Sequence, residues 1–311
     1  MNQSWPELPF AAWRDTCATL HLWTQVVGKI RLAQTAWLNH SWHVPLYVTA
    51  RGLTTSPIPH GERSFEMEFD FNEHVLDIRV SDGDGERILL QPQSVADFYA
   101  KVMHALTTLE LPVSINDFPC EIPGAIHFSR DNTHGAYDKE YAQRFWRVLL
   151  QVDRVMKHFR TAFLGKSSPV HFFWGSFDLA VTRFSGRRAP DFTAKVPGLS
   201  TSVMREAYSH EVSSAGFWPG GGGIDYAAFY SYAYPTPAQF KAQPVQPAAA
   251  TYSDTLGEFL LPYDDVRTAS DPQSALLSFF QSTYEAAAVT GNWDRAALEC
   301  ALGRPRSPRV S

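Results

Sequence analysis

Residues 205–237 read REAYSHEVSSAGFWPGGGGIDYAAFYSYAYPTP, and this stretch decides the fold class. Its first part, up to Val212, has no helical periodicity, and residues 224–234 are rich in aromatic side chains, as strands are. We therefore expect a strand, a turn and a second strand. Because successive side chains of a strand face opposite sides, Tyr230 and Tyr232 share one face of the second strand. Their apolar rings and polar tips suit a half-wet surface better than a dry core.

Four consecutive glycines, Gly220–Gly223, follow Trp218 and Pro219 between these two predicted strands. Ordering them costs conformational entropy, and glycine is useful where the backbone approaches a ligand closely. Two interpretations stay open: a loop that lines a ligand pocket through Gly220 and Gly221, and a flexible hairpin loop without a partner. The run lacks the GxGxxG and Walker patterns, so it does not indicate a phosphate site.

Helical and strand patterns alternate along the rest of the chain. Helices are predicted at residues 10–34, 137–164 and 272–289, from the spacing of their apolar side chains. A further helix is predicted after Ser94, which caps it, with Val95, Phe98, Val102 and Leu106 on its buried face. Residues 64–71 alternate strictly between apolar and acidic side chains and predict a half-buried strand, followed by strands at 75–80 and 87–90. Further strands are expected at 169–184. The predicted class is α+β, with antiparallel sheets flanked by long helices.

The order of these elements suggests two similar helix–sheet–helix halves. We predict an N-terminal half at residues 1–115, an irregular crossover at 116–137 that is rich in proline and glycine, and a C-terminal half at 138–301. The two halves are expected to form one compact unit. The basic, proline-containing tail at 302–311 is predicted to be disordered.

The composition limits the class of function. The chain has 311 residues, of which 44% are hydrophobic and 19% charged, as in a globular protein. A formal net charge of -5 argues against a general binder of nucleic acids or membrane surfaces, and no apolar run is long enough to span a membrane. Three distant cysteines without a CxxC pair, and an N-terminus without a signal-peptide pattern, favour a cytoplasmic location.

The best candidate site joins residues 171–187 to residues 205–234. Asp178 lies in a strongly apolar run, so it needs a partner if it is buried, and Arg183 and Arg187 are candidates. In one hypothesis Asp178 or Glu211 acts as a general base and His210 transfers protons. In the other, Asp178 and arginine form a buried pair that only fixes the sheet. The residues predicted to bind substrate are His171, Trp174, Arg183, Trp218, Gly220, Gly221, Tyr230 and Tyr232.

The same region contains the residue types of a metal site. His171, His210 and Asp178 correspond to a site with two histidines and one carboxylate. In a chain with 11 histidines, two histidines and one carboxylate in neighbouring strands are weak evidence for a metal site, so we assign no metal ligand. The identity of any cofactor stays open.

Several distinctive phrases indicate a family. They are WPELP at 5–9, NHSWHVPLYVTARGLTTSPI at 39–58, FDFNEH at 69–74, SVADFY at 94–99, HFFWGSFDLAVTRFSGR at 171–187 and SHEVSSAGFWPGG at 209–221. With these phrases the chain resembles a bacterial family catalogued as a domain of unknown function, number 5996. The resemblance covers nearly the whole chain and implies one unit across both halves. It implies no activity, cofactor or catalytic residue.

The sequence therefore leaves the function open between two classes. The first is a small-molecule-binding protein with an aromatic-lined pocket, which includes the case of an enzyme that uses acid/base residues. The alternative is a non-catalytic module that binds a ligand or a protein, including a homo-oligomer that buries Tyr230 and Tyr232. Catalysis requires Asp178, His210 or Glu211 to be open to a cavity. The alternative predicts that internal bonds saturate them.

Overall fold

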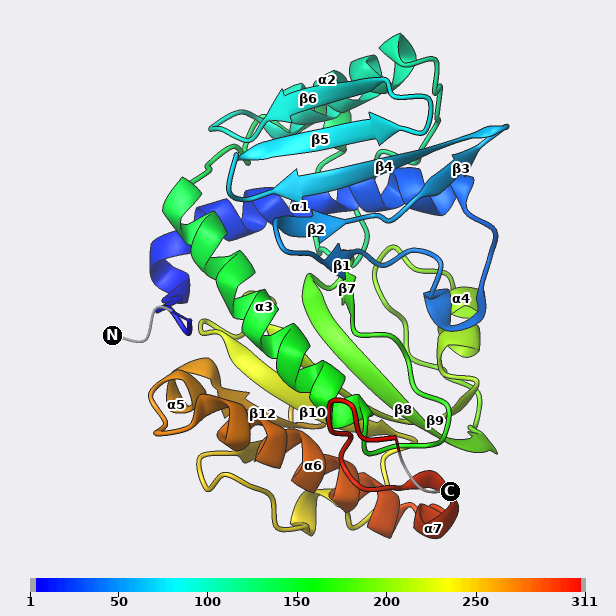
Figure 1. The fold of residues 1–311 in the computed structure, drawn as a ribbon, viewed down its shortest axis with the longest axis vertical. Helices are drawn as coiled ribbons and strands as arrows, with labels where there is room; N and C mark the ends of the chain where they lie inside the picture. The colour runs from blue at the N-terminus through cyan, green and yellow to red at the C-terminus, as the bar shows by residue number, and fades with distance from the viewer. Residues whose placement is uncertain (1–3, 309–311) are drawn as a thin grey trace.

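Two antiparallel sheets of six strands each, with long helices packed on them, make up the computed structural model, which describes residues 4–308 (Figure 1). This arrangement confirms the predicted α+β class. Each half of the chain begins with a long helix and continues through six strands to a helical end; in the second half a short α-helix interrupts the strands and three helices follow them. The predicted order of helix, sheet and helix is therefore present twice.

The first sheet follows the helix α1 (Phe10–Gln34) and precedes the helix α2 (Val95–Thr108). Its strands, in chain order, are β1 (Tyr47–Val48), β2 (Gly52–Thr54), β3 (Ile58–His60), β4 (Arg63–Asp70), β5 (Val75–Val80) and β6 (Gly85–Leu89). They pair in the order β1-β2-β4-β5-β6, and β3 pairs with β4. In β4 the alternation works as predicted, because Phe65, Met67 and Phe69 are buried in the core. Ser94 caps α2 by accepting a hydrogen bond from the Asp97 N–H at 3.0 Å.

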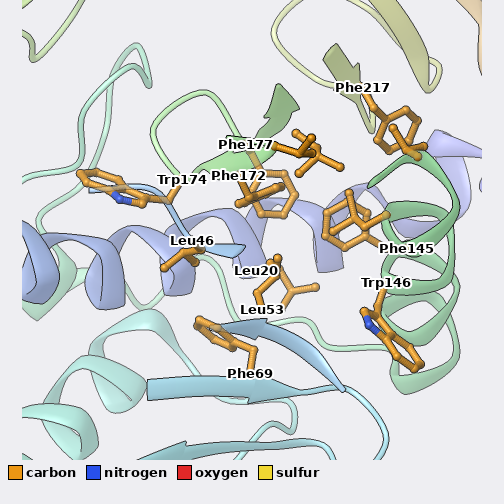
Figure 2. Close-up of a cluster of buried hydrophobic side chains, with 14 of the residues drawn as sticks. Leu20, Leu46, Leu53, Phe69, Phe145, Trp146, Phe172, Trp174, Phe177 and Phe217 are labelled. Carbon is orange, nitrogen blue, oxygen red and sulfur yellow. The ribbon is translucent and has the colours of Figure 1, made fainter. Parts of the chain in front are cut away.

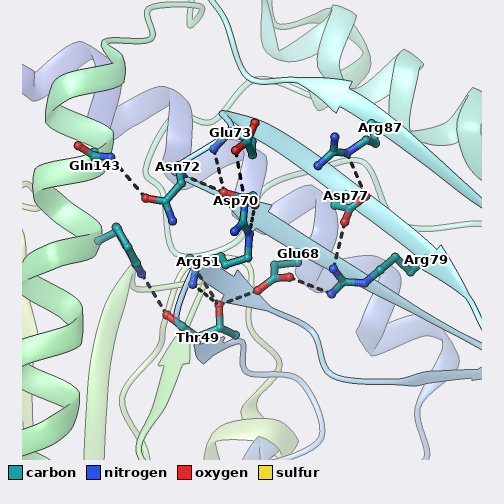
Figure 3. Close-up of polar contacts among 12 residues, drawn as sticks. Thr49, Arg51, Glu68, Asp70, Asn72, Glu73, Asp77, Arg79, Arg87 and Gln143 are labelled. Carbon is teal, nitrogen blue, oxygen red and sulfur yellow. Dashed lines mark hydrogen bonds and ion pairs between the residues drawn. The ribbon is translucent and has the colours of Figure 1, made fainter.

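The face of this sheet opposite Phe65, Met67 and Phe69 carries a network of charged side chains (Figure 3). Arg79 pairs with Glu68 at 2.8 Å and with Asp77 at 3.0 Å. Glu68 also accepts a hydrogen bond from the Thr49 hydroxyl at 2.6 Å, and Arg51 pairs with Asp70. These pairs satisfy carboxylates of which two, Glu68 and Asp70, are buried, so their role is structural.

An irregular segment that is rich in proline and glycine joins the two halves. Between α2 and the next long helix it contains only the short 3-10 helix η2 (Phe128–Arg130). The helix α3 (Lys139–Arg160) then begins after Asp138, whose side chain accepts hydrogen bonds from two backbone N–H groups of the first turn. It is shorter at both ends than the predicted helix at 137–164.

The second sheet has the strand order β11-β12-β10-β9-β8-β7. Its strands are β7 (His171–Phe173), β8 (Asp178–Arg188), β9 (His210–Trp218), β10 (Ala228–Tyr234), β11 (Thr251–Ser253) and β12 (Glu258–Pro262). The remaining elements are η1 (Asn39–Ser41), α4 (Thr201–Ala207), η3 (Phe240–Ala242), α5 (Tyr263–Arg267), α6 (Pro272–Thr290) and α7 (Arg295–Leu298).

The two faces of the second sheet differ in what covers them. The odd-numbered side chains of β8 and β9, such as Leu179, Val181 and Phe217, belong to the main hydrophobic core, and α3 and α6 pack on this face. The even-numbered ones, such as Asp178 and Thr182, point to the opposite face. That face is covered by α4, the neighbouring η1 and the chain around them (Figure 1).

The predicted strand at 205–212 is partly wrong, because residues 205–207 are the end of the helix α4. Ser200 caps this helix by accepting a hydrogen bond from the Val203 N–H at 3.3 Å, and β9 begins only at His210. A helix of seven residues makes two turns, which is too short to show a helical period in the sequence. The second predicted strand, at 224–234, begins only at Ala228.

One hydrophobic core runs through both halves (Figure 2). Leu20 of α1 and Phe69 of the first sheet belong to the same cluster as Phe145 of α3 and Phe217 of the second sheet. None of the described helices combines the length and the apolar character that a membrane crossing needs. Of the tail predicted to be disordered, residues 309–311 lie outside the described residues, and the Gly303 N–H donates to the Thr161 hydroxyl at 2.9 Å.

Candidate functional site

A cavity of about 500 Å³ lies on the even-numbered face of the second sheet. Side chains of β7, β8, β9, β10 and β12 form its floor, and the chain around η1 forms one wall. The segment 189–209, which connects β8 to β9 and includes α4, covers it. This connecting segment is fixed by the Glu121 N–H, which donates to the Pro197 carbonyl at 2.8 Å, and by the Tyr234 hydroxyl, which donates to the Pro190 carbonyl at 2.9 Å.

Asp178 lies in the floor of the cavity, and its partners are hydroxyl groups rather than the arginines considered from the sequence. The Ser176 hydroxyl donates to one carboxylate oxygen and the Tyr230 hydroxyl to the other. Burial raises the pKa of Asp178, and these two hydrogen bonds act in the opposite direction. Asp178 is 6% exposed, so its carboxyl is a buried group with both oxygens satisfied.

Two further carboxyls, Glu121 and Glu258, line the same cavity and were missed by the sequence analysis. Burial raises the pKa of each to about 7, and the nearby negative charge of Asp178 acts in the same direction. No described residue forms a hydrogen bond or an ion pair with either carboxyl group. A Cβ atom at Gly175 would overlap the carboxyl of Glu121, so the absence of a side chain at Gly175 makes room for it.

Hydroxyl groups continue the polar part of the floor. The Tyr208 and Tyr232 hydroxyls are 2.9 Å apart, and those of Thr182 and Ser214 are also 2.9 Å apart. Burial raises the pKa of both tyrosines, so these phenols stay neutral. Tyr208 also stacks on Phe192 of the connecting segment, with ring centroids 4.6 Å apart. The lining of the cavity therefore offers neutral hydroxyls beside the three carboxyls.

Aromatic side chains and a histidine form much of the remaining lining. The Trp174 indole N–H donates to the Val44 carbonyl at 2.9 Å, and its ring packs on α1 at Gly28, where a Cβ atom would overlap it. Trp218 also lines the cavity. His171 is 1% exposed, and its Nδ1 has no hydrogen-bond partner among the described residues. Burial lowers the pKa of His171 to about 3, so the imidazole is neutral.

The rim of the cavity holds a cationic group. His40 lines the cavity, and its Nε2 lies 2.7 Å from the Lys166 ammonium. Lys166 also lies over the rings of Trp42 and Phe184, at 5.1 and 4.9 Å from their centroids. Lys166 itself is outside the lining.

A model of the Family of unknown function (DUF5996) matches residues 5–300. The chain belongs to this family. No curated protein and no solved structure matches the chain. The matched range includes every residue that lines the cavity of this family member.

Six of the residues predicted for the site line this cavity. They are Asp178, His171, Trp174, Trp218, Tyr230 and Tyr232. The even-numbered strand positions among them share one face, which is why the sheet brings them together. The part of the lining that comes from residues 37–44 and from Glu121 lies far away in the sequence, and no local pattern marks it.

Arg183 was predicted to share the site, and the structure corrects this. It lies on the odd-numbered face of β8, where its guanidinium lies 3.5 Å from the ring centroid of Phe159 and 4.3 Å from that of Tyr284. It donates a hydrogen bond to the Phe159 carbonyl. Arg183 and Asp178 are an odd number of positions apart along one strand, so the two side chains point to opposite faces.

Glu211, His210 and the glycine run also lie outside the lining. Glu211 pairs with Arg187 at 2.7 Å and accepts a hydrogen bond from Ser185 at 2.8 Å, so it is saturated by internal bonds. His210 lies beyond the rim, with its ring centroid 6.0 Å from that of His40.

Gly220 and Gly221 form an ordered turn away from the cavity. The Gly221 N–H donates to the Ile224 carbonyl at 2.7 Å, and a Cβ at Gly220 would lie 2.6 Å from the Phe10 ring. All four glycines of the run have positive φ angles, from 55° to 106°, a conformation that glycine adopts without strain. Among residues 4–308, no group of three His, Cys, Asp or Glu side chains could hold a metal ion.

Proposed function

We propose that this protein binds a small organic molecule in the cavity on the second sheet. The observation that carries the proposal is the cavity itself: about 500 Å³, lined by aromatic rings and by a small number of converging polar groups. Sites for small molecules have volumes of roughly 300–1,000 Å³ and this kind of lining.

The packing of the rest of the protein supports this proposal. Protein interiors are close-packed, and the odd-numbered face of the same sheet is filled by α3 and α6. The cavity is partly open to the surface, so water fills it when no ligand is bound. Its aromatic walls favour the ligand.

An acid/base enzyme is the second candidate, and one observation favours it. Glu121 and Glu258 have pKa values raised to about 7, next to Asp178. At neutral pH such a site holds a carboxylic acid and a carboxylate together, which general acid/base catalysis requires. Because Asp178 is bonded at both oxygens and Glu211 is ion-paired, Glu121 and Glu258 are the better candidates for proton transfer.

We favour this function over a homo-oligomer that buries the tyrosine face. Tyr230 and Tyr232 face the cavity, and Tyr230 is 9% exposed, so these rings offer little area to a second copy of the chain.

On the family resemblance and on the three free cysteines, we also propose that the protein works in the bacterial cytoplasm.

Native mass spectrometry of the purified protein, followed by extraction and identification of small molecules, tests the binding proposal. We expect a bound organic molecule in the native protein and a loss of it in Thr182→Phe, which fills the cavity from β8. The matched control is Thr251→Phe, on the exposed edge strand β11, which should keep the molecule. Equal occupancy of both variants would overturn the assignment of the molecule to this cavity.

A further inference from the structure

We infer that the ligand of this cavity is a small organic cation: a protonated amine on an apolar or aromatic body. This inference rests on the proposed function and names the chemical class of its ligand. Four observations carry it: the charge of the lining, the unpaired carboxyls, the aromatic walls and an unpaired histidine.

The lining has an acidic character that no internal cation balances. Glu121, Asp178 and Glu258 all line the cavity, whereas the part of the chain that the structure describes contributes no lysine or arginine to it. Lys166, at the rim, is bound to His40 and lies outside the lining. A bound cation would be attracted by the three carboxyls and would supply the missing counter-charge.

Two of the carboxyls are also free to accept hydrogen bonds. Within residues 4–308, neither Glu121 nor Glu258 has a hydrogen-bond or ion-pair partner for its carboxyl group. Removing a carboxylate from water without a partner is unfavourable. An ammonium group, with its N–H donors, would satisfy both the charge and the lone pairs of these groups.

The walls favour the same class of ligand. Trp218 and the tyrosines Tyr230 and Tyr232 lie on the same face of the sheet as Asp178 and Glu258. The faces of aromatic rings are electron-rich and attract cations, most strongly where water is excluded. The same rings provide apolar area for the body of the ligand, which a simple metal ion does not have.

His171 is the independent observation that points to a ligand. It is 1% exposed, it lines the cavity, and its Nδ1 has no hydrogen-bond partner among the described residues. It lies opposite Ala180, two residues along β8 from Asp178. A neutral imidazole adds no charge that would repel a cation, and it can pair with a second polar group of the ligand.

The experiment compares four probes of defined charge: benzylamine, benzyl alcohol, benzoate and calcium chloride. Binding is measured by isothermal titration calorimetry and by the shift in unfolding temperature, at about pH 8, which is above the pKa of about 7 of Glu121 and Glu258. We expect benzylamine to bind at least about tenfold more tightly than benzyl alcohol, and benzoate and calcium to bind weakest. Glu121→Gln and Glu258→Gln should each weaken benzylamine about fivefold or more and leave benzyl alcohol unchanged.

Glu211→Gln is the matched control, because Glu211 lies in the same sheet but outside the cavity, and it should leave benzylamine binding unchanged. The outcomes separate the two proposals. If no probe binds and no molecule co-purifies, the binding function fails and this inference with it. If benzyl alcohol or benzoate binds as tightly as benzylamine, the cavity is a binding site and only the cationic class is overturned.

Two other results would also overturn the inference. In the first, calcium binds as tightly as benzylamine and binds more weakly to the glutamine variants. The ligand of the cavity would then be an inorganic cation. In the second, the glutamine variants weaken the binding of benzyl alcohol as much as that of benzylamine. The carboxyls would then only maintain the shape of the cavity.

Discussion

The phenol ring of Tyr230 lies over Gly216. Gly216 pairs with Tyr230 on one side and with Ala180 on the other, so β9 separates the strand of Tyr230 from that of Asp178. A Cβ atom at Gly216 would overlap the tyrosine ring. The missing side chain therefore lets Tyr230 cross a whole strand and donate its hydrogen bond to Asp178.

Gly216→Ala is expected to destabilise the protein by roughly 1–3 kcal/mol, the usual cost of overpacking. The cost should fall to a few tenths of a kcal/mol in a Tyr230→Ala background, where the ring is absent. Urea unfolding of the wild type, both single variants and the double variant measures this coupling. Equal costs in the two backgrounds would show that the ring is not the obstacle.

Tyr230→Phe removes a hydrogen bond that lowers the pKa of Asp178. We expect that pKa to rise further, and the free energy of unfolding to fall by about 1–3 kcal/mol, because one carboxylate oxygen loses its donor. Carboxyl-carbon NMR titration and urea unfolding check the two effects. Tyr226→Phe, at a 41% exposed tyrosine, is the control and should change neither.

Glu121 and Glu258 should make the protein less stable as the pH rises. Their pKa is about 7 in the folded protein, against an ordinary value of 4.5 for a glutamate in water, so between these values the folded state binds more protons than the unfolded state. The contribution of these carboxyls to the free energy of unfolding is fully present below about pH 4.5. It decreases as the pH rises to about 7, by at most about 3 kcal/mol for each carboxyl. Glu121→Gln and Glu258→Gln should each be more stable than the wild type at about pH 8.

Histidines act in the opposite direction over part of this range. Burial lowers the pKa of His21 to about 4 and that of His171 to about 3, so their contribution to stability is lost as the pH falls below 6.5. The informative quantity is therefore the difference between each glutamine variant and the wild type, measured by urea unfolding across the pH range. A difference that does not vary with pH would refute the raised pKa values.

Arg183→Met is expected to change the free energy of unfolding by less than about 1 kcal/mol, whereas Arg183→Ala should cost about 3–5 kcal/mol. Methionine keeps contact with the rings of Phe159 and Tyr284 and removes a buried charge, two of whose nitrogen atoms have no partner among the described residues. Chemical unfolding of both variants tests this. If methionine proves as costly as alanine, the charge of Arg183 is what stabilises this packing.

The sequence predicted those features that depend on local periodicity. The alternation in residues 64–71 and the shared face of Tyr230 and Tyr232 follow from the two-residue period of a strand, and both are present in the structure. The same period also separates Asp178 from Arg183 and His210 from Glu211. The sequence therefore contains the reason why neither pair shares one site.

Other parts of the site have no local signal. Glu121 belongs to the irregular crossover and Glu258 begins a strand, and only the tertiary fold places both beside Asp178. Residues 37–44 reach the cavity because η1 packs beside α4. Such convergence depends on contacts between segments that lie far apart in the chain, which periodicity does not report.

The alternation of side chains between the two faces of the second sheet also has an evolutionary consequence. In β8 and β9 the odd-numbered side chains maintain the core and the even-numbered ones meet the cavity, so the same strands carry two sets of positions under separate selection. Substitutions at Ala180, Thr182 and Ser214 can change which molecule is recognised while Leu179, Val181 and their neighbours keep the protein folded. A relative that acquires a new ligand is therefore expected to differ at every second residue of these strands.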